Sequence, residues 1–326
     1  MSPRELAVRY GFLVLFAALV IYFALAAPGF VSPQSAVFVF QSVAITGVLA
    51  LGVTATLVVG GFDLSIGSVA TSSMMAAAYA MVVLDQGVFV AVAACLAIGI
   101  IVGLINGFLI AYVEIPAMLA TLASSMFMVG MLRFAILRGE FLLLLPKSDP
   151  TVAFLAGDLL PGLSVPVVLM AATLVATWFL LRRSTPGRVI YAMGDNFQAA
   201  RLTGLPVRRT AIVVYVFAGL TALVAGLIMA AANGAVDFRT VTNGTLLFDV
   251  ILVVVLGGIP LRGGRGGVRN VVVGVALIAI LRNGMTLMDF TTQTQDMLKG
   301  LVLLTAIVVD NYLNPRDAET DTVGDL

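Results

Sequence analysis

The stretch RRSTPGRVIYAMGDNFQAARLTGLPVRR, Arg182–Arg209, is a polar and basic interruption in a largely apolar chain. It carries six arginines against one acid, Asp195, and an arginine pair stands at each end. Arginine pairs beside apolar runs are typical of the cytoplasmic side of a membrane protein. Within the stretch, Asp195 or Asn196 can cap a helix that begins directly after them, and Gly204 can end it. The stretch therefore predicts a helical, basic platform suited to docking a soluble partner; the alternative is a solvated loop that only fixes topology.

The composition is that of an integral membrane protein. Of the 326 residues, 61% are hydrophobic and 11% are charged, against roughly 25% charged in a soluble domain; the mean hydropathy is +1.11. The net charge of +1 gives no general attraction for nucleic acid. The chain has one cysteine, Cys95, and no histidine, which excludes a disulfide framework, thiolate metal sites and histidine-dependent catalysis. We therefore expect no catalytic residue, bound metal or bound cofactor in this chain.

Ten stretches satisfy the requirement of roughly 20 mostly apolar residues for a membrane span. In order they are Gly11–Ala27, Ala36–Val59, Leu64–Leu84, Val88–Val113, Ala117–Leu137, Val165–Leu181, Thr210–Ala232, Asn243–Ile259, Val268–Met288 and Met297–Leu313. The first is expected to be a spanning helix, because no A-x-A-like cleavage site follows its basic start.

The charges that flank these stretches predict the topology. With the N-terminus in the cytoplasm, twelve basic residues fall on the inner side and six on the outer side, which is the direction of the positive-inside rule. We therefore expect an all-α, polytopic helical membrane protein with some short or broken helices, forming a single transmembrane domain over residues 1–326. Both termini and the loop 182–209 would be cytoplasmic, and the tail 314–326 would be disordered.

Two glycine-rich motifs each follow a run of valine and leucine. They are GGFDLSIG at 60–67 and GGIPLRGGRGG at 257–267, each followed later by an Asn-Gly pair, at Asn106 and Asn283. This order indicates an internal repeat, as in many transporters, but a partial one, because the spacing differs between the halves. Paired glycines let the backbone leave helical geometry or pack closely. The motifs therefore predict a broken helix or hinge beside a permeation pathway; the alternative is ordinary helix ends, capped in the first motif by Asp63 and Ser65.

Asp249, between Phe248 and Val250, is the clearest acid inside a predicted span. Charges at membrane depth are costly and usually functional. A chain of carboxylates would indicate an ion-coupled pump, whereas a single one argues against that mechanism. The residues proposed for a pathway or hinge are Gly60, Gly61, Asp63, Ser65, Gly67, Asn106, Asp249, Gly257, Gly258 and Asn283.

Together these segments resemble the permease subunits of sugar ABC importers, the ribose, xylose, galactose and autoinducer-2 group. The resemblance covers nearly the whole chain from Gly60 onward and rests on several motifs in order. They are GGFDLSIGSV at Gly60–Val69, LINGFLI at Leu104–Ile110, IPAMLATLASS at Ile115–Ser125, TPGRVIYAMGDNFQAARLTGLPVRRTAIVVYVFAGL at Thr185–Leu220 and VVLGGIPLRGGRGGV at Val254–Val268. One departure is Phe248, because many relatives carry an acidic residue before the aspartate that matches Asp249.

The resemblance implies a role for the platform. In such permeases a cytoplasmic loop carries a short coupling helix that docks in a groove of the ATPase subunit. Gln198-Ala199-Ala200 followed by Gly204 is similar to the EAA-x3-G signature of importer loops, with Gln in place of Glu. The residues implied in coupling are Arg188, Gly194, Asp195, Asn196, Gln198, Ala199, Ala200, Arg201 and Gly204.

The resemblance also implies the assembly. The expected partners are cytoplasmic ABC ATPase subunits, a second permease copy (identical or not), an extracytoplasmic solute-binding protein and the lipid of a bacterial cytoplasmic (inner) membrane. The chain has no Walker motif, so ATP and Mg²⁺ are expected on the ATPase. The implied substrate is a monosaccharide. The alternatives are a nucleoside or a branched-chain amino acid in a related ABC importer and, from another class, an ion-coupled secondary transporter.

Overall fold

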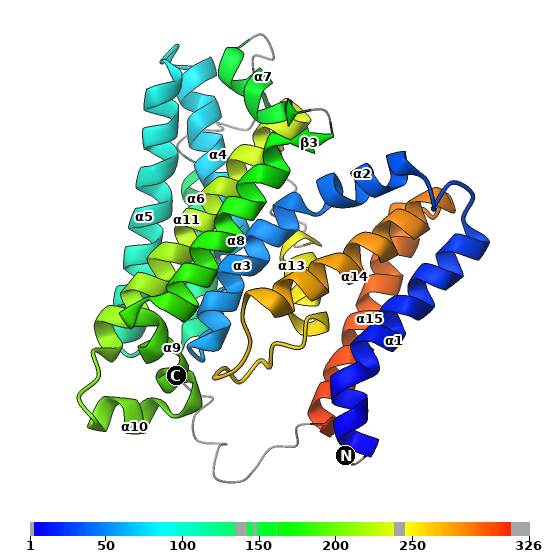
Figure 1. Cartoon of the computed structure of the whole chain (residues 1–326). Helices are drawn as coiled ribbons and strands as arrows, with labels where there is room; N and C mark the ends of the chain where they lie inside the picture. The colour runs from blue at the N-terminus through cyan, green and yellow to red at the C-terminus, as the bar shows by residue number, and fades with distance from the viewer. Residues whose placement is uncertain are drawn as a thin grey trace.

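The computed structural model describes residues 3–132, 134, 142–145, 149–160, 162–237 and 245–313. Most of these residues are helical, and many of the long helices run side by side (Figure 1). The helices are α1 (Pro3–Ala26), α2 (Pro33–Ser42), α3 (Ala44–Val58), α4 (Ile66–Val82), α5 (Val88–Ala111), α6 (Ala117–Leu132), α7 (Pro150–Ala156), α8 (Val165–Arg183), α9 (Thr185–Asp195), α10 (Phe197–Leu202), α11 (Val207–Asn233), α13 (Thr245–Leu256), α14 (Val268–Leu287) and α15 (Thr292–Leu313). The strands are β1 (Leu142–Leu144), β2 (Asp158–Leu160), β3 (Leu163–Ser164) and β4 (Ala235–Asp237).

Helix α3 is the buried axis of the molecule. Every residue of it except Ile45 is buried, and α8, α11, α13 and α14 all contact it. Small residues let neighbouring helices cross closely: a Cβ added to Gly219 of α11 would overlap the backbone of Gly99 in α5. The buried axis ends at the platform, where Val58 packs in one cluster with residues of α9 and α10.

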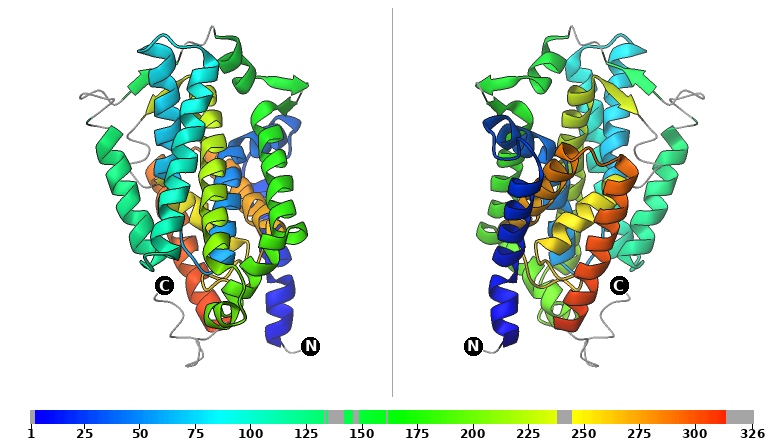
Figure 2. Two further views of the ribbon diagram at one scale, coloured as in Figure 1. Left: turned by 90° about the vertical axis from the view of Figure 1, so that its left-hand side faces the viewer. Right: turned by 90° about the vertical axis from the view of Figure 1, so that its right-hand side faces the viewer.

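The described residues are mostly helical, as expected, but short strands stand at the end of the molecule opposite the platform. There β1 pairs with β4 and β2 pairs with β3, both antiparallel. The short helix α7 lies at the same end (Figure 2) and is capped by Asp149, whose carboxylate accepts hydrogen bonds from the backbone of Thr151 and Val152. Backbone donors and acceptors between the long helices are therefore satisfied partly by short strand pairs, which hydropathy does not predict.

The described parts of the predicted spans fall mainly on helices; the end of Ala117–Leu137 and the start of Asn243–Ile259 lie outside the described residues. One span, Ala36–Val59, falls on α2 and α3, which meet at a bend of 41°. Among the described residues, four helices are long and apolar enough to cross a membrane alone, or five if the bent pair is one span. The four are α5, α8, α11 and α14. Shorter apolar stretches of 10–17 residues lie in α1, α4, α6 and α13. The chain is thus a helical membrane protein, and the number of ten spans stays a prediction.

Helix α1 begins and α15 ends at the same end of the molecule as α9 and α10 (Figure 1, Figure 2). We call this the platform end. The turn between α4 and α5 lies at the opposite end, together with α7. This relative placement agrees with the predicted topology. The tail 314–326, predicted to be disordered, lies outside the described residues.

Candidate functional site

The platform, residues 182–209, folds as two short helices with local caps. The Ser184 hydroxyl accepts a hydrogen bond from Gly187 N at 3.0 Å and begins α9. The Asn196 side chain accepts one from Ala199 N at 2.9 Å and begins α10, so Asn196 and not Asp195 is the cap. Helix α10 ends at Leu202, and Gly204, predicted to end it, follows two residues later with φ +78°. The sequence therefore predicted the platform helices and their ends correctly.

An apolar cluster attaches the platform to the ends of the long helices. Ile190 and Met193 of α9 and Ala200 of α10 are buried. They pack in one cluster with Val58 at the end of α3 and with Val214 of α11. The platform is therefore a folded extension of the core and not a solvated loop.

Three glycine-containing segments meet beside the platform. A Cβ added to Gly194 of α9 would overlap the carbonyl oxygen of Val58 and the backbone of Gly264, and one added to Gly263 would come within 2.8 Å of Gly60. Gly264 N also donates a hydrogen bond to Val58 O at 2.9 Å. We call Gly60, Gly194, Gly263 and Gly264 the glycine junction. Each motif was predicted separately from the sequence, but their meeting was not.

A tyrosine strengthens the glycine junction. The Tyr191 hydroxyl donates a hydrogen bond to Gly266 O at 2.8 Å, linking α9 to the loop between α13 and α14. Burial raises the pKa of the Tyr191 phenol, although the charge of Arg182 partly opposes this. The phenol therefore stays protonated at neutral pH and keeps its donor role.

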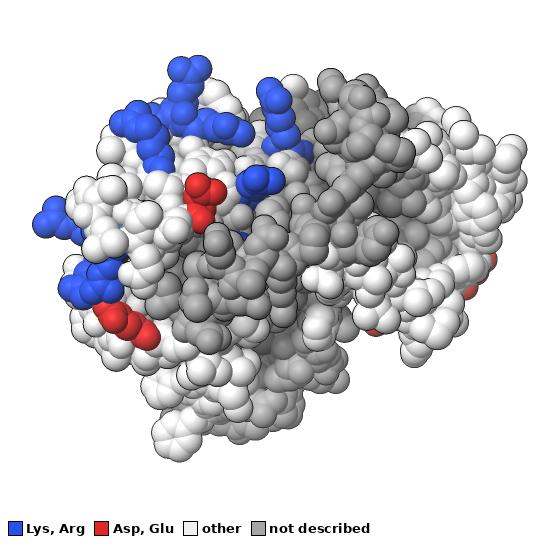
Figure 3. Space-filling model, turned by 90° about the horizontal axis from the view of Figure 1, so that it is seen from below, with Lys and Arg blue, Asp and Glu red and all other residues white. Residues whose placement is uncertain are grey.

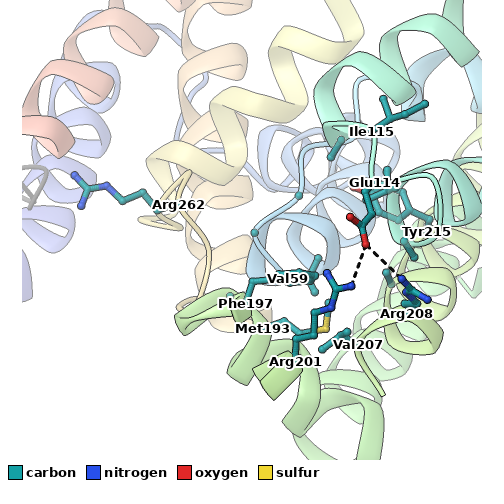
Figure 4. Close-up of a pocket in the computed structure, with 17 residues that line it drawn as sticks. Val59, Glu114, Ile115, Met193, Phe197, Arg201, Val207, Arg208, Tyr215 and Arg262 are labelled. Atoms are coloured by element: carbon teal, nitrogen blue, oxygen red, sulfur yellow. Dashed lines mark hydrogen bonds and ion pairs between the residues drawn. The ribbon is translucent and has the colours of Figure 1, made fainter. Parts of the chain in front are cut away.

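Glu114 ties the platform to the turn between α5 and α6. Its carboxylate lies 3.2 Å from the guanidinium of Arg201 in α10 and 3.3 Å from that of Arg208 in α11 (Figure 4). Glu114 has φ +61°, which is uncommon for a residue other than glycine. The Arg208 guanidinium also covers the Tyr112 ring at 5.3 Å. This contact is not evident from the sequence, because Glu114 and Arg201 are far apart along the chain.

A cavity of about 70 Å³ lies between these groups, lined by the end of α3, the α5–α6 turn, the platform and α11 (Figure 4). The buried hydroxyl of Tyr215 lines it and has no hydrogen-bond partner among the described residues. Gly61 leaves the space for this hydroxyl, because an added Cβ would overlap it. The first glycine motif therefore packs against α11 as well as against the platform.

The break between α3 and α4 is held by buried polar groups. The Asp63 carboxylate accepts hydrogen bonds from Ser65 N at 2.8 Å and from the Ser65 hydroxyl at 2.6 Å. The Asn106 amide donates to the same hydroxyl at 3.0 Å. Asp63 therefore bonds the residue at the start of α4, where Ser65 is the N-cap without a side-chain cap hydrogen bond, and Asn106 of α5 joins this group.

The remaining glycine and asparagine candidates lie in unlike surroundings. Gly257 packs on the backbone of Asn270, whose side chain donates a hydrogen bond to Gly257 O at 2.7 Å, and Gly258 has φ +75°. Gly67 lies in α4 with nothing within 4 Å of an added Cβ, so no contact requires a glycine there. Asn283 donates to the Ser35 hydroxyl at 2.6 Å and joins α14 to α2, away from the glycine junction.

Asp249, the clearest acid inside a predicted span, forms an ion pair. Its carboxylate lies 2.7 Å from the Lys299 ammonium, which also lies 2.8 Å from Asp296. Lys299 lies near the start of α15. Because α13 and α15 lie side by side, two groups 50 residues apart form an ion pair, which the sequence analysis did not predict.

The outward side of the platform is basic and carries one exposed apolar side chain. Figure 3 shows arginines gathered over one part of the platform end. Leu202 of α10 is 87% exposed, beside exposed Gln198 and Ala199. Arg188 and Asp195 are also exposed. Sequence analysis missed Leu202, although a leucine inside an otherwise polar short helix is a recognisable signal.

Comparisons with known proteins agree with this architecture. Residues 35–307 match the family model described as branched-chain amino acid transport system / permease component. The chain is 34% identical over 304 residues to the L-arabinose transport system permease protein AraH of Escherichia coli (strain K12), which covers 93% of this chain and 90% of that protein. It is 31% identical over 293 residues to the ribose import permease protein RbsC of the same strain, with 87% and 88% covered. The chain therefore belongs to the family of transport-system permease components that includes the L-arabinose and ribose permeases.

Proposed function

We propose that this chain is the membrane-spanning subunit of an ATP-binding-cassette importer and that it passes a monosaccharide into the cell. The observation that carries the proposal is the nearly full-length similarity to permeases named for L-arabinose and ribose transport. An extracytoplasmic binding protein would deliver the sugar, and separate ATPase subunits would bind ATP and Mg²⁺. The importer would lie in a bacterial cytoplasmic membrane and contain a second permease copy, with both termini of each copy in the cytoplasm.

The platform is the proposed docking site for the ATPase. Its buried side is occupied by the core, so α10 presents Gln198, Ala199 and Leu202 outward. An exposed leucine on a polar helix suits burial in a groove of a partner protein, where interface cores are more apolar than the remaining surface. The surrounding arginines can pair with acidic groups at the rim of such a groove.

The contacts of the platform supply a route for coupling. Gly194 touches the backbone at the end of α3 and in the α13–α14 loop, and Glu114 connects α10 to the α5–α6 turn. Closely packed groups transmit a displacement, and at Gly194 the backbone of Val58 and Gly264 already fills the space of an added Cβ. Movement of α10 by the ATPase would therefore shift the ends of α3, α5 and α13 together. We infer that this shift alternates the pathway between outward and inward access.

A branched-chain amino acid is the second candidate substrate, because the family model is described by that transport system. Uptake assays separate the two classes. Proteoliposomes that contain the permease, its ATPase and its binding protein should take up a labelled pentose, and excess unlabelled leucine should not compete. Competition by leucine and not by pentoses would favour the amino acid.

Leu202 tests the docking site directly. Leu202→Glu should lower co-purification of the ATPase with the permease and abolish the rise in ATP hydrolysis caused by loaded binding protein. Permease levels in the membrane should stay normal, because the side chain is 87% exposed. Leu202→Met is the matched control, since it keeps an apolar side chain of similar size, and it should behave as the wild type. Unchanged ATPase binding and stimulation in Leu202→Glu would contradict docking through α10.

A further inference from the structure

Two carboxylates and one ammonium group meet on the face formed by α13 and α15. The Lys299 Nζ lies 2.7 Å from Asp249 Oδ1 and 2.8 Å from Asp296 Oδ1. We call these three residues the charge triad. Their side chains are partly exposed, at 17% for Lys299, 23% for Asp249 and 41% for Asp296. Within the described part of the chain no other residue forms an ion pair with them, so the triad carries a net charge of −1.

The charge triad lies at membrane depth. Asp249 stands seven residues before the platform end of α13 at Leu256, a distance of about 10 Å at the helical rise per residue. Figure 2 shows α13 and the first part of α15 inside the height spanned by the long helices α5 and α11, whereas the end of α15 extends beyond them at the platform end. A hydrocarbon core of roughly 30 Å crossed by these long helices therefore contains the charge triad.

The surroundings of the charge triad follow from its net charge and exposure. Acyl chains cannot hydrogen-bond the free carboxylate oxygens, and a charge facing lipid is strongly unfavourable. A dry protein contact would bury the unbalanced charge without a partner, which is also unfavourable. Water satisfies both carboxylates and the charge. The α13–α15 face is therefore expected to border water inside the membrane.

We propose that this face lines the translocation pathway and that the charge triad contacts the sugar in transit. This inference rests on the proposed function as a monosaccharide permease. The carboxylates of Asp249 and Asp296 accept hydrogen bonds from sugar hydroxyl groups. Lys299 holds both carboxylates in place with two of its three N–H donors and keeps the third for a sugar oxygen. The contact is suited to a neutral, hydroxyl-rich solute.

Thiol reactivity tests whether the face borders water. Gly300 lies one turn after Asp296, and an added Cβ there meets nothing within 4 Å, so Gly300→Cys keeps all three charges. In a Cys95→Ser background, this cysteine should react with the charged reagent methanethiosulfonate ethylsulfonate in right-side-out or inverted vesicles. The control is Ile101→Cys in the middle of α5, where the side chain is 53% exposed and expected to face lipid.

The expected result is reaction at position 300 at least about tenfold faster than at position 101, because only a hydrated thiol ionises and reacts. Equal rates at the two positions would overturn the pathway assignment. This measurement needs no transport, so it is independent of the proposed function. If position 300 reacts but no monosaccharide is transported by the parent protein, the proposed function fails and the water-lined face stands.

Transport by triad variants tests the sugar contact. Asp249→Asn keeps the volume and removes one charged acceptor, so pentose uptake at low sugar should fall by about tenfold, the factor for one charged hydrogen bond. Membrane levels and ATPase co-purification should not change, which distinguishes the variant from one with a disturbed platform. The half-saturating concentration of loaded binding protein should stay the same. Uptake at the parent rate in both Asp249→Asn and Asp296→Asn would overturn the sugar contact.

Discussion

Two glycines of the platform are required for different physical reasons. Gly204 has φ +78°, and nothing lies within 4 Å of an added Cβ, so the backbone conformation and not space requires glycine. Gly194 lacks a positive φ, but its Cβ position is already occupied by the backbone of Val58 and Gly264. The sequence shows that glycine is present at each position. It does not distinguish the two reasons, because the second depends on segments far apart in the chain.

The positive φ of Gly204 therefore predicts that two substitutions at this position differ in their effect. Gly204→Val should destabilise the end of α10 by about 1–2 kcal/mol, the cost of a left-handed residue, and should lower sugar-stimulated ATP hydrolysis. Gly204→Asn should behave nearly as the wild type, because asparagine adopts this conformation more readily than most residues. ATP hydrolysis by reconstituted importer checks both. Equal loss in both variants would show that the partner and not the backbone requires glycine.

At the charge triad, one residue was identified from the sequence and its ion-pair partner was not. Asp249 was identified from its position in an apolar run, which is a local signal. Its partner Lys299 lies near the start of α15, where a basic residue is ordinarily explained by the membrane interface. Only the packing of α13 on α15 brings the two side chains to 2.7 Å. The hydropathy pattern identified Asp249 but could not identify its ion pair with Lys299.

At the scale of elements, the platform helices were predictable because their signals are local. Caps at Ser184 and Asn196 and the ending at Gly204 each depend on residues within one turn. The contact of Glu114 with Arg201 and Arg208 was not predictable, because it joins three elements. The same distinction explains the strand pairs at the opposite end, since β1 and β4 pair across a long stretch of sequence.

The Glu114 contact predicts a weak, salt-dependent link between elements. A double-mutant cycle of Glu114→Gln and Arg201→Gln should give a coupling free energy of about 0.2–1 kcal/mol at low salt, because both side chains are about half exposed. The coupling should disappear at about 1 M salt, where the Debye length falls to about 3 Å. Thermal unfolding of the four proteins in detergent measures it. A coupling that persists at high salt would indicate a buried, stronger pair than the structure shows.

At the scale of the whole molecule, the relative placement of the ends was predicted from charge. The arginine bias requires the platform, the start of α1 and the end of α15 to share a side, and the structure places them together. The short strands and α7 lay beyond prediction, because loops between spans carry no strong hydropathy pattern. Which of the two ends faces the cytoplasm is a separate question, and the positive-inside rule predicts that the platform end does.

Thiol labelling of intact cells should therefore distinguish the two ends. With Cys95 replaced by serine, Gln86→Cys at the α4–α5 turn should react with an impermeant maleimide added outside. Thr185→Cys at the start of α9 should react only after the cells are opened. Both native side chains are exposed, so neither substitution should disturb folding. Labelling of position 185 in intact cells would invert the topology and exclude a cytoplasmic ATPase from the platform.

The glycine junction joins the platform to the long helices, and a substitution at Gly194 tests whether this contact is needed for coupling. Gly194→Ala places a Cβ on the carbonyl oxygen of Val58 and on Gly264, so α9 must move away from α3 at a cost of about 1–3 kcal/mol, typical of overpacking. The spans should still insert, because the change lies outside them. Uptake and sugar-stimulated ATP hydrolysis should fall together, since the displaced platform no longer moves with the end of α3.

Gly67→Ala is the matched control for this prediction. It changes a glycine of the first motif into the same residue, but nothing lies within 4 Å of the added Cβ, and alanine favours the helix α4 that begins there. It should therefore leave uptake unchanged and raise stability slightly. If Gly194→Ala also transports normally while permease and ATPase levels match the control, the close contact at Val58 is not the route of coupling. The ATPase would then act on the spans through the Glu114 contact or through α11.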